Sequence, residues 1–405
     1  MTSIGLGPWL LASGCTTERV SALSALVNLP WGLKVVIAPL VDSPICGRKF
    51  GLRRPWIVFG QFGLLVSLVL LGIATYGAGM DETLQLLAVL GVIYTSFNAL
   101  TSVAVETMAI DLLPHGEKAR TNAAMTAGWT VGDAMMGSLS GALLPMIHLS
   151  GVATFCALLV LPSLVLMICV IERPSEPENS SSNGASSSSS SSHAEDAPLL
   201  TRLTSLLHGL LFNKASVLVL VSMIFAQTAY GASGTVNSRL LLTKGLSSGE
   251  TSTFYSIASI VCGAFGVLIW PLVDRYGARR FFAFTIGIQA LSYVAIYSYG
   301  SAMTATHIIV LDLIKWLTQT ANWVAFATFC MRLSTSLAVA TQYAALMAVR
   351  NSCTIMGDAL VATGLVATPV GWFGVFAALS SIGCVVAIAI PDIGDDGKPK
   401  PRVLL

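Results

Sequence analysis

The sequence predicts an all-α membrane protein that is built from two related helical bundles. Of its 405 residues, 54% are hydrophobic and only 10% are charged, whereas about 25% of the residues in a soluble globular protein are charged. The mean hydropathy is +0.77. The segment Pro39–Asp42 (PLVD), followed by Gly51–Arg54 (GLRR), is repeated as Pro271–Asp274 (PLVD), followed by Gly277–Arg280 (GARR). A repeated turn between apolar helices indicates an internal duplication.

Eleven segments are long and apolar enough to cross the membrane, because about 20 apolar residues span ~30 Å of hydrocarbon. The first half contains predicted spans at 20–41, 56–78, 84–112, 122–146 and 151–171. The second half contains predicted spans at 215–242, 250–273, 281–299, 305–331, 337–365 and 371–390. We therefore expect an N-terminal bundle over 1–173 and a C-terminal bundle over 214–391.

Three further segments lie outside the predicted bundles. Residues 174–197 are rich in serine and contain no helical or strand periodicity, which predicts a disordered linker. Leucines at helical spacing over 198–213 predict an amphipathic helix on the membrane surface. Residues 392–405 are expected to form a tail on the same side of the membrane as the linker.

The duplication indicates that the first helix of the chain is short. Gly14 aligns with Gly245, and the later helix begins near Ala215, so its early counterpart would begin about 16 residues before Met1. The remaining Ile4–Ser13 would make about 15 Å of helix, which cannot span a bilayer. We expect six plus six ancestral helices with the first one truncated, through either a wrongly assigned start codon or a shortened variant.

The basic residues predict how the chain is oriented, since cytoplasmic loops carry an excess of Lys and Arg. Placing both Gly–Arg-Arg turns in the cytoplasm puts sixteen of the 22 basic residues inside. Only Arg19 and Lys244 then fall in outside loops. The linker and the C-terminal tail are therefore expected to be cytoplasmic.

These motifs resemble the major facilitator superfamily over essentially the whole chain. The acid–Gly–Arg-Arg turns are similar to its signature loop, although Ser43–Phe50 lengthens the first copy. Leu29–Lys34 (LPWGLK) before Pro39–Asp42 resembles the branch of muropeptide permeases, acetyl-CoA transporters and folate–biopterin transporters. The resemblance implies alternating access between two six-helix bundles. It also implies a gating role, with positive-inside anchoring as the alternative, for Asp42, Arg53, Arg54, Asp274, Arg279 and Arg280.

Eight charged side chains lie more than two residues inside the ends of the predicted spans, where each must pair or face a wet cavity. They are Lys34, Arg239, Lys315, Arg350, Glu106, Asp133, Asp312 and Asp358. Lys34 follows the helix-kinking Pro30, so it either lines a cavity for an anionic solute or pairs with an acid such as Glu106. Glu106 either binds a proton or solute, or serves as that partner.

The other charges allow similar alternatives. Asp312 and Lys315 share a helix face at i,i+3 and either form an ion pair or, with Asn322 and Trp323, a ligand wall. Arg350 either binds a carboxylate or phosphate through its bidentate guanidinium or pairs with an acid such as Asp358. Asp133, which is flanked by small residues, is expected to be a buried hydrogen-bonding group.

The sequence therefore predicts a secondary active transporter of a polar, anionic organic solute, with coupling to protons as a hypothesis. A transport-inactive or regulatory paralogue is the alternative. All five histidines fall at span ends or in loops, and no nucleophile elbow, phosphate loop or metal-ligand spacing is present, so we expect no enzyme, cofactor or metal site. The expected partners are a small-molecule solute, protons and the lipid bilayer, with no nucleic acid, and we expect a monomer.

Overall fold

The computed structural model describes residues 5–41, 51, 53–112, 118–169, 214–333 and 339–391. The predicted linker at 174–197, the predicted surface helix at 198–213 and the predicted tail at 392–405 lie outside these residues. The described N-terminal helices are α1 (Gly7–Ala12), α2 (Thr17–Gly32), α3 (Lys34–Val41), α4 (Arg54–Ala74), α5 (Met80–Leu112) and α6 (Lys118–Cys169). The described C-terminal helices are α8 (Lys214–Thr243), α9 (Ser248–Tyr276), α10 (Ala278–Tyr299), α11 (Ala305–Leu333), α12 (Val339–Ala362) and α13 (Pro369–Ile388).

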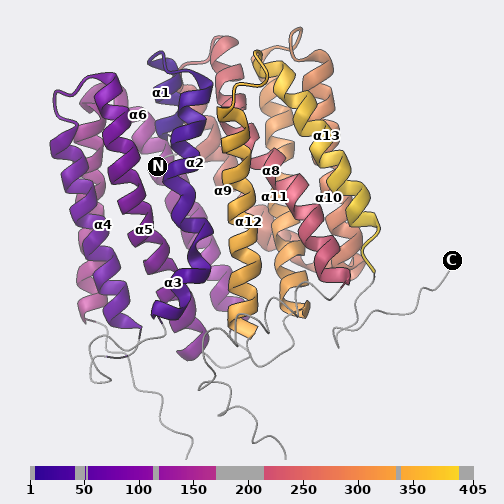
Figure 1. The fold of residues 1–405 in the computed structure, drawn as a ribbon, viewed down its shortest axis with the longest axis horizontal. Coiled ribbons are helices and arrows are strands. Elements are labelled where there is room, and N and C mark those ends of the chain that lie inside the picture. The colour runs from indigo at the N-terminus through magenta and orange to yellow at the C-terminus, as the bar shows by residue number, and fades with distance from the viewer. Residues whose placement is uncertain are drawn as a thin grey trace, which may run out of the picture.

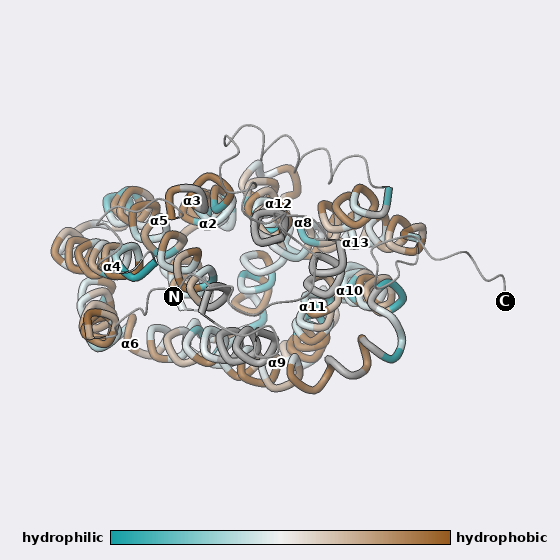
Figure 2. The backbone as a smooth tube through the Cα atoms, turned by 90° about the horizontal axis from the view of Figure 1, so that it is seen from below, coloured by the Kyte–Doolittle hydropathy of each residue, from teal (hydrophilic) through white to brown (hydrophobic). Residues whose placement is uncertain are grey.

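The helices form two bundles that stand side by side, α1–α6 and α8–α13 (Figure 1). Seen along the helices, the bundles meet on two sides (Figure 2). On one side α2 and α3 pack against α12, and on the other side α6 packs against α9. We call the α2–α12 and α6–α9 contacts together the seam between the bundles.

Eight described helices are long and apolar enough to cross a membrane. The prediction of eleven spans differs for two reasons. The 42-residue segment Gly128–Cys169 of α6 covers most of two predicted spans, 122–146 and 151–171. They are separated where His148 leaves the helical conformation with a φ of 56°. Helices α11 and α12 are 29 and 24 residues long, but each contains charged and amide side chains within its predicted span, which lower its hydropathy.

The internal duplication is visible in backbone geometry at the ends of α1 and α8. Gly14 and Gly245 both have a φ of +95°, the left-handed conformation that glycine adopts without a steric penalty. The residue after each glycine donates its N–H to a carbonyl five residues earlier, Cys15 to Leu10 and Leu246 to Leu241. This is the Schellman arrangement that ends helices, and it confirms the pairing of Gly14 with Gly245.

The helices that follow these glycines also begin alike. The Thr16 side chain accepts a hydrogen bond from the N–H of Arg19 at the start of α2. The Ser247 side chain accepts one from the N–H of Glu250 at the start of α9. Both are helix N-caps, which satisfy backbone donors that lack a partner within the helix. The two copies therefore share the turn and the start of the following helix.

The span predicted at 20–41 is broken within its length into two helices. Helix α2 ends at Gly32, Leu33 has non-helical backbone angles, and α3 begins at Lys34. Pro30 lies three residues before this break, and proline disrupts a helix because it lacks an N–H and crowds the preceding turn. The break places Lys34 at the first position of a new helix beside α5 and α12.

Helix α4 shows how the apolar surface is divided between lipid and protein. Its buried positions include Gly60, Gly63, Leu64 and Ser67, and small residues there let α5 approach closely. Its exposed positions are large and apolar: Phe59, Phe62, Val66, Val69, Leu70 and Ile73. An exposed face of this size and composition is suited to lipid rather than to water.

Helices α8 and α12 are in contact through glycines. A Cβ on Gly231 would lie 2.6 Å from the carbonyl oxygen of Thr354, and a Cβ on Gly357 would lie 2.2 Å from the carbonyl oxygen of Thr228. Backbone atoms of a neighbouring helix cannot move aside cheaply. The glycines therefore fix α12 to α8 within the C-terminal bundle.

We predict that Gly231→Ala lowers the stability of the protein by roughly 1–3 kcal/mol, because the added methyl group meets the α12 backbone. Gly234→Ala, three residues along the same helix, is the matched control because no atom lies within 4 Å of its added Cβ. The control should be neutral or stabilising by up to about 1 kcal/mol, given the higher helix propensity of alanine. Thermal unfolding in detergent compares the two variants, and equal midpoints would contradict the prediction.

The two ends of the molecule differ in how the bundles meet. At the end that holds α1 and the α8–α9 turn, called the α1 end, Arg239 donates a hydrogen bond to the carbonyl of Leu11 at 3.4 Å. Leu242 packs there against the apolar cluster of the N-terminal bundle, and a Cβ on Gly141 of α6 would lie 2.3 Å from Cβ of Ser252 on α9.

At the end that holds Arg54 and Arg279, called the arginine end, the described residues form separate apolar clusters for the two bundles. The bundles are therefore closed against each other at the α1 end.

Candidate functional site

The break between α2 and α3 positions a compact polar group that lies beside the seam. Lys34 Nζ lies 3.0 Å from Glu106 Oε1 and 2.9 Å from Ser102 Oγ, and Ser102 Oγ donates to the same carboxylate oxygen at 2.8 Å. The ammonium group also lies 4.6 Å from the centre of the Trp31 ring, a distance at which a cation is attracted to an aromatic face. The predicted pairing of Lys34 with Glu106 is confirmed.

The two members of this pair differ in exposure. The Lys34 side chain is 9% exposed, whereas the Glu106 side chain is 50% exposed. The Glu106 side chain is therefore half exposed to the space around the helices, whereas the Lys34 side chain is shielded from it. A solute or a proton approaching this group meets Glu106 first.

Arg350 on α12 is the second cation beside the seam. Its Cζ atom lies 3.9 Å from the centre of the Trp323 ring on α11, and both residues are partly buried. The next residue, Asn351, donates a hydrogen bond across the seam to the Trp31 carbonyl at 3.4 Å. Lys34 and Arg350 come from different bundles, and each lies over a tryptophan at this crossing.

Asp312 and Lys315 form the predicted ion pair inside the C-terminal bundle. Their side chains are 1% and 2% exposed, so neither faces an open cavity. Lys315 Nζ also donates to Ser233 Oγ at 3.2 Å and lies 5.6 Å from the centre of the Tyr230 ring, both on α8. Asp312 Oδ2 is buried with no hydrogen-bond partner among the described residues.

The amide side chains of α11 are also turned into the C-terminal bundle. Gln319 donates to Gln227 on α8 at 2.7 Å, and Asn322 donates to Thr285 on α10 at 3.4 Å. Both amides are buried, at 6% and 2% exposure. Of the side chains that the sequence placed on one ligand wall, Trp323 is the one that contacts Arg350.

Asp358 lies in the seam rather than beside Arg350. It is 4% exposed, and its Oδ2 accepts a hydrogen bond of 2.7 Å from Ser24 Oγ on α2 of the other bundle. Eight residues separate Arg350 from Asp358, which is about 12 Å along a helix. The two side chains therefore belong to different contacts of α12.

The arginine end shows the same use of arginine in both bundles. Arg54 donates to the carbonyls of Met167 and Ile168 near the end of α6, and Arg279 donates to the Ile390 carbonyl just beyond α13 at 2.8 Å. Cations are stabilised at helix C-termini, where carbonyls lack partners and the helix dipole is negative. These arginines hold the end of the last helix in their own bundle.

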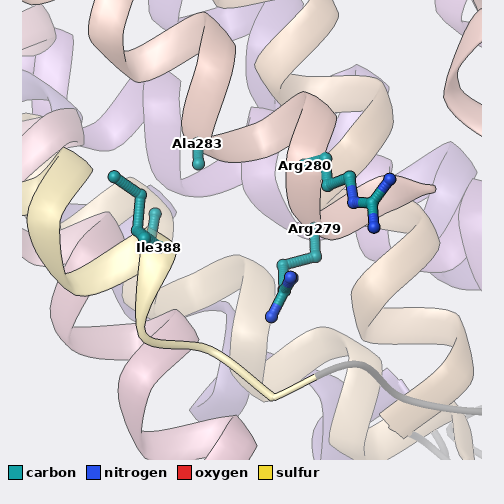
Figure 3. Close-up of a pocket in the computed structure, with 5 residues that line it drawn as sticks. Arg279, Arg280, Ala283 and Ile388 are labelled. Carbon is teal, nitrogen blue, oxygen red and sulfur yellow. The ribbon is translucent and has the colours of Figure 1, made fainter. Parts of the chain in front are cut away.

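Of the remaining predicted gating residues, the structure describes the side chains of Arg53 and Arg280. Arg53 is buried and donates to the Val41 carbonyl at 2.8 Å. Arg280 lines a pocket with Arg279, Ala283, Ala387 and Ile388 (Figure 3). Asp42 and the side chain of Asp274 lie outside the described residues, so the predicted gating role stays a prediction.

Three residues that contribute to these groups were not predicted from the sequence. Ser24 is an ordinary serine in an apolar helix, and its partner is 334 residues away. Asn351 follows Arg350 directly, and nothing in its neighbours indicates a contact with the other bundle. Ser102 precedes Glu106 by four residues, so a search for polar residues at i−4 from each buried acid would have found it.

Two bundles of membrane-spanning helices with buried charges along a shared seam are typical of membrane transport proteins. The chain belongs to the Major Facilitator Superfamily, whose family model matches residues 16–358. It is an integral multi-pass membrane protein and a transporter, not an enzyme.

Solved structures with the same fold are similar to this chain over nearly its whole length. A variant of the nucleoside transporter NupG aligns with a TM-score of 0.67 and 14% identity, covering 96% of each chain. A D-xylose-proton symporter aligns with a TM-score of 0.68 and 11% identity, covering 98% of this chain and 93% of that one. At these identities the likeness shows the fold alone.

Proposed function

We propose that this protein is a secondary active transporter that moves a polar, anionic organic solute by alternating access and couples its movement to protons. The position of Lys34 and Arg350 is the observation that supports an anionic solute. These cations come from opposite bundles and lie over Trp31 and Trp323 at one crossing of the seam. A carboxylate or phosphate bound there would contact both bundles.

The chemistry of the crossing favours an anion with an organic body. A guanidinium forms bidentate hydrogen bonds with a carboxylate or phosphate, and its position over an indole limits its orientation. The two tryptophans supply apolar surface beside the charges. The branch resemblance of Leu29–Lys34 to muropeptide, acetyl-CoA and folate–biopterin transporters agrees with a charged organic solute.

The orientation and the gating are part of the same proposal. The arginine end faces the cytoplasm, in keeping with the positive-inside rule, and the closed α1 end faces outward. The arginines at the ends of α6 and α13 keep each bundle intact while the bundles move against each other.

A stabilisation screen on the purified protein tests the proposed solute class. The probes are acetate, succinate and glycerol phosphate as anions, with uridine and D-xylose as neutral polar solutes. We expect at least one anion to raise the unfolding midpoint, because a ligand at 100 times its Kd stabilises by about 2.7 kcal/mol. Stabilisation by the neutral solutes alone would refute the anionic assignment.

Uptake into proteoliposomes tests the coupling. The anion that stabilises best should accumulate when the outside is made more acidic than the lumen, and a protonophore should abolish the accumulation. Uptake that does not depend on the pH gradient would refute the proposed coupling to protons. No uptake of any probe would favour the transport-inactive alternative.

A further inference from the structure

Asp358 differs from the two lysine-paired acids in its partner. Glu106 and Asp312 each form a salt bridge with a lysine. Within the described part of the chain, the hydrogen-bond partner of Asp358 is the Ser24 hydroxyl group, and no cation lies within salt-bridge distance. A carboxylate buried with one hydroxyl donor is disfavoured far more than a neutral carboxylic acid in the same place.

The ionisable groups on the surrounding helices do not replace a cation partner. Glu18 lies six residues before Ser24 on α2, about 9 Å along the helix, and Lys34 lies ten residues after it, about 15 Å away. Lys34 and Lys315 are already paired with Glu106 and Asp312. The ionisable side chains on the elements packed against this part of α12 are Glu18, Arg19, Lys34, Tyr230, Arg239, Asp312 and Lys315, with Arg350 and Cys353 on α12 itself.

The Ser24–Asp358 contact lies between parts that must separate if the α1 end opens. Asp358 is four residues from the end of α12 at the α1 end, about 6 Å along the helix. The neighbouring Gly357 is fixed against the α8 backbone, so α12 moves with its own bundle. Ser24 moves with α2. Opening of the α1 end would break the contact and give the Asp358 carboxyl group access to water.

Ser24 is itself oriented by its helix. Asn28 Nδ2 donates to Ser24 Oγ at 3.3 Å, so the serine oxygen accepts from Asn28 and its hydrogen is directed to Asp358 Oδ2. The other oxygen of Asp358 is the place where a proton would be carried. The contact therefore accommodates a neutral acid without any rearrangement of Asn28 or Ser24.

We propose that Asp358 binds a proton when the α1 end closes and releases it when that end opens. This inference rests on the proposed transport function and assigns the pH control of its α1 end to one group, which exchanges its proton with the water at that end. The closed seam stabilises the neutral acid, and the open seam admits water that stabilises the carboxylate. By linkage, protonation of Asp358 favours the closed α1 end, so the closed population rises as the pH falls.

Distance measurements between the bundles test this without any solute. Spin labels are placed at Ser13 and Ala302, two exposed positions at the α1 end in different bundles, on the full chain with its eight cysteines replaced. Pulsed electron paramagnetic resonance should show more of the short distance as the pH is lowered from 8 to 5. The ratio of closed to open protein should change by up to about tenfold per pH unit, the limit for one proton.

Two variants decide whether Asp358 is responsible. Asp358→Asn mimics the neutral acid and should stay closed at every pH, with the pH response lost. Asp133→Asn changes an acid on α6 that follows Gly132 as Asp358 follows Gly357, and it should keep the response. Asp133 is partly exposed rather than buried as the sequence predicted. An unaltered response in Asp358→Asn, or no response in the wild type, would overturn the inference.

The same variants separate this inference from the proposed function. If the wild-type protein accumulates the best anion under a pH gradient and Asp358→Asn does so equally, the transport proposal stands and the role of Asp358 fails. If the distances respond as expected but no probe is transported, the role of Asp358 stands and the transport proposal fails. Ser24→Ala provides a second route if Asp358→Asn fails to fold, and it should shift the pH response without abolishing it.

Discussion

Lys315→Met is expected to destabilise the protein by about 3–5 kcal/mol, the cost of breaking a buried ion pair by removing one partner. The Lys315 and Asp312 side chains are 2% and 1% exposed, so water cannot replace the lost ammonium group. Asp312 Oδ2 already has no hydrogen-bond partner among the described residues. Removal of Lys315 would leave the other oxygen of the carboxylate without its cation as well.

The double variant Asp312→Asn with Lys315→Met removes both charges and should recover most of that loss. Replacing a buried ion pair by neutral groups of similar size is often close to neutral for stability. Unfolding midpoints in detergent for the two single variants and the double variant measure the coupling between the residues. A double variant that is as unstable as Lys315→Met would show that the pair does not set the stability.

Arg19 and Asp81 provide a matched control on the surface. Their charged atoms lie 2.9 Å apart, but their side chains are 64% and 82% exposed. Arg19→Ala should therefore change the stability by no more than about 1 kcal/mol. The contrast between the two pairs tests burial rather than the presence of a salt bridge.

The double variant also separates the two roles that the sequence leaves open for Asp312 and Lys315. A stable double variant that transports the best anion would limit the pair to structure. A stable double variant that no longer transports would give the pair a part in the transport cycle, through its contacts with Tyr230 and Ser233 on α8.

The features that sequence predicts well here are set by local chemistry. A helix end with glycine in the left-handed conformation is specified by a few adjacent residues, so the sequence alone is sufficient to pair Gly14 with Gly245. The Asp312–Lys315 pair depends only on the i,i+3 spacing. Lys34 and Glu106 are 72 residues apart, but the cost of burying either charge alone restricts their partners to a few residues.

The features that sequence misses depend on packing between distant segments. Nothing near Ser24 indicates that it faces Asp358, because any hydroxyl on the seam could have done so. The carbonyls that Arg54 and Arg279 hold lie in α6 and just beyond α13, and they have no residue-type signal. The sequence predicts the break at Leu33 only as a kink at Pro30, since proline marks a weak point without fixing where the helix resumes.

Arg350→Lys should lower the affinity for the best anion by about 10–100-fold, although the positive charge is kept. Lysine cannot form the planar bidentate contact, and a hydrogen bond to a charged group contributes roughly 1.5–3 kcal/mol. Arg350→Met, which removes the charge, should abolish binding. Isothermal titration of the purified protein measures both losses, and the unfolding midpoint without ligand shows whether the fold is intact.

Trp323 supplies the matched control, because it positions the guanidinium rather than contacting an anion through charge. Its ring lies 3.9 Å from Arg350 Cζ, and phenylalanine retains an aromatic face at that position. Trp323→Phe should therefore weaken binding by only a few-fold, since such a contact contributes ~0.5–2 kcal/mol and phenylalanine preserves part of it. If Arg350→Met binds the anion as tightly as the wild type, the solute does not bind at Arg350. The site would then lie nearer to Lys34 and the half-exposed Glu106.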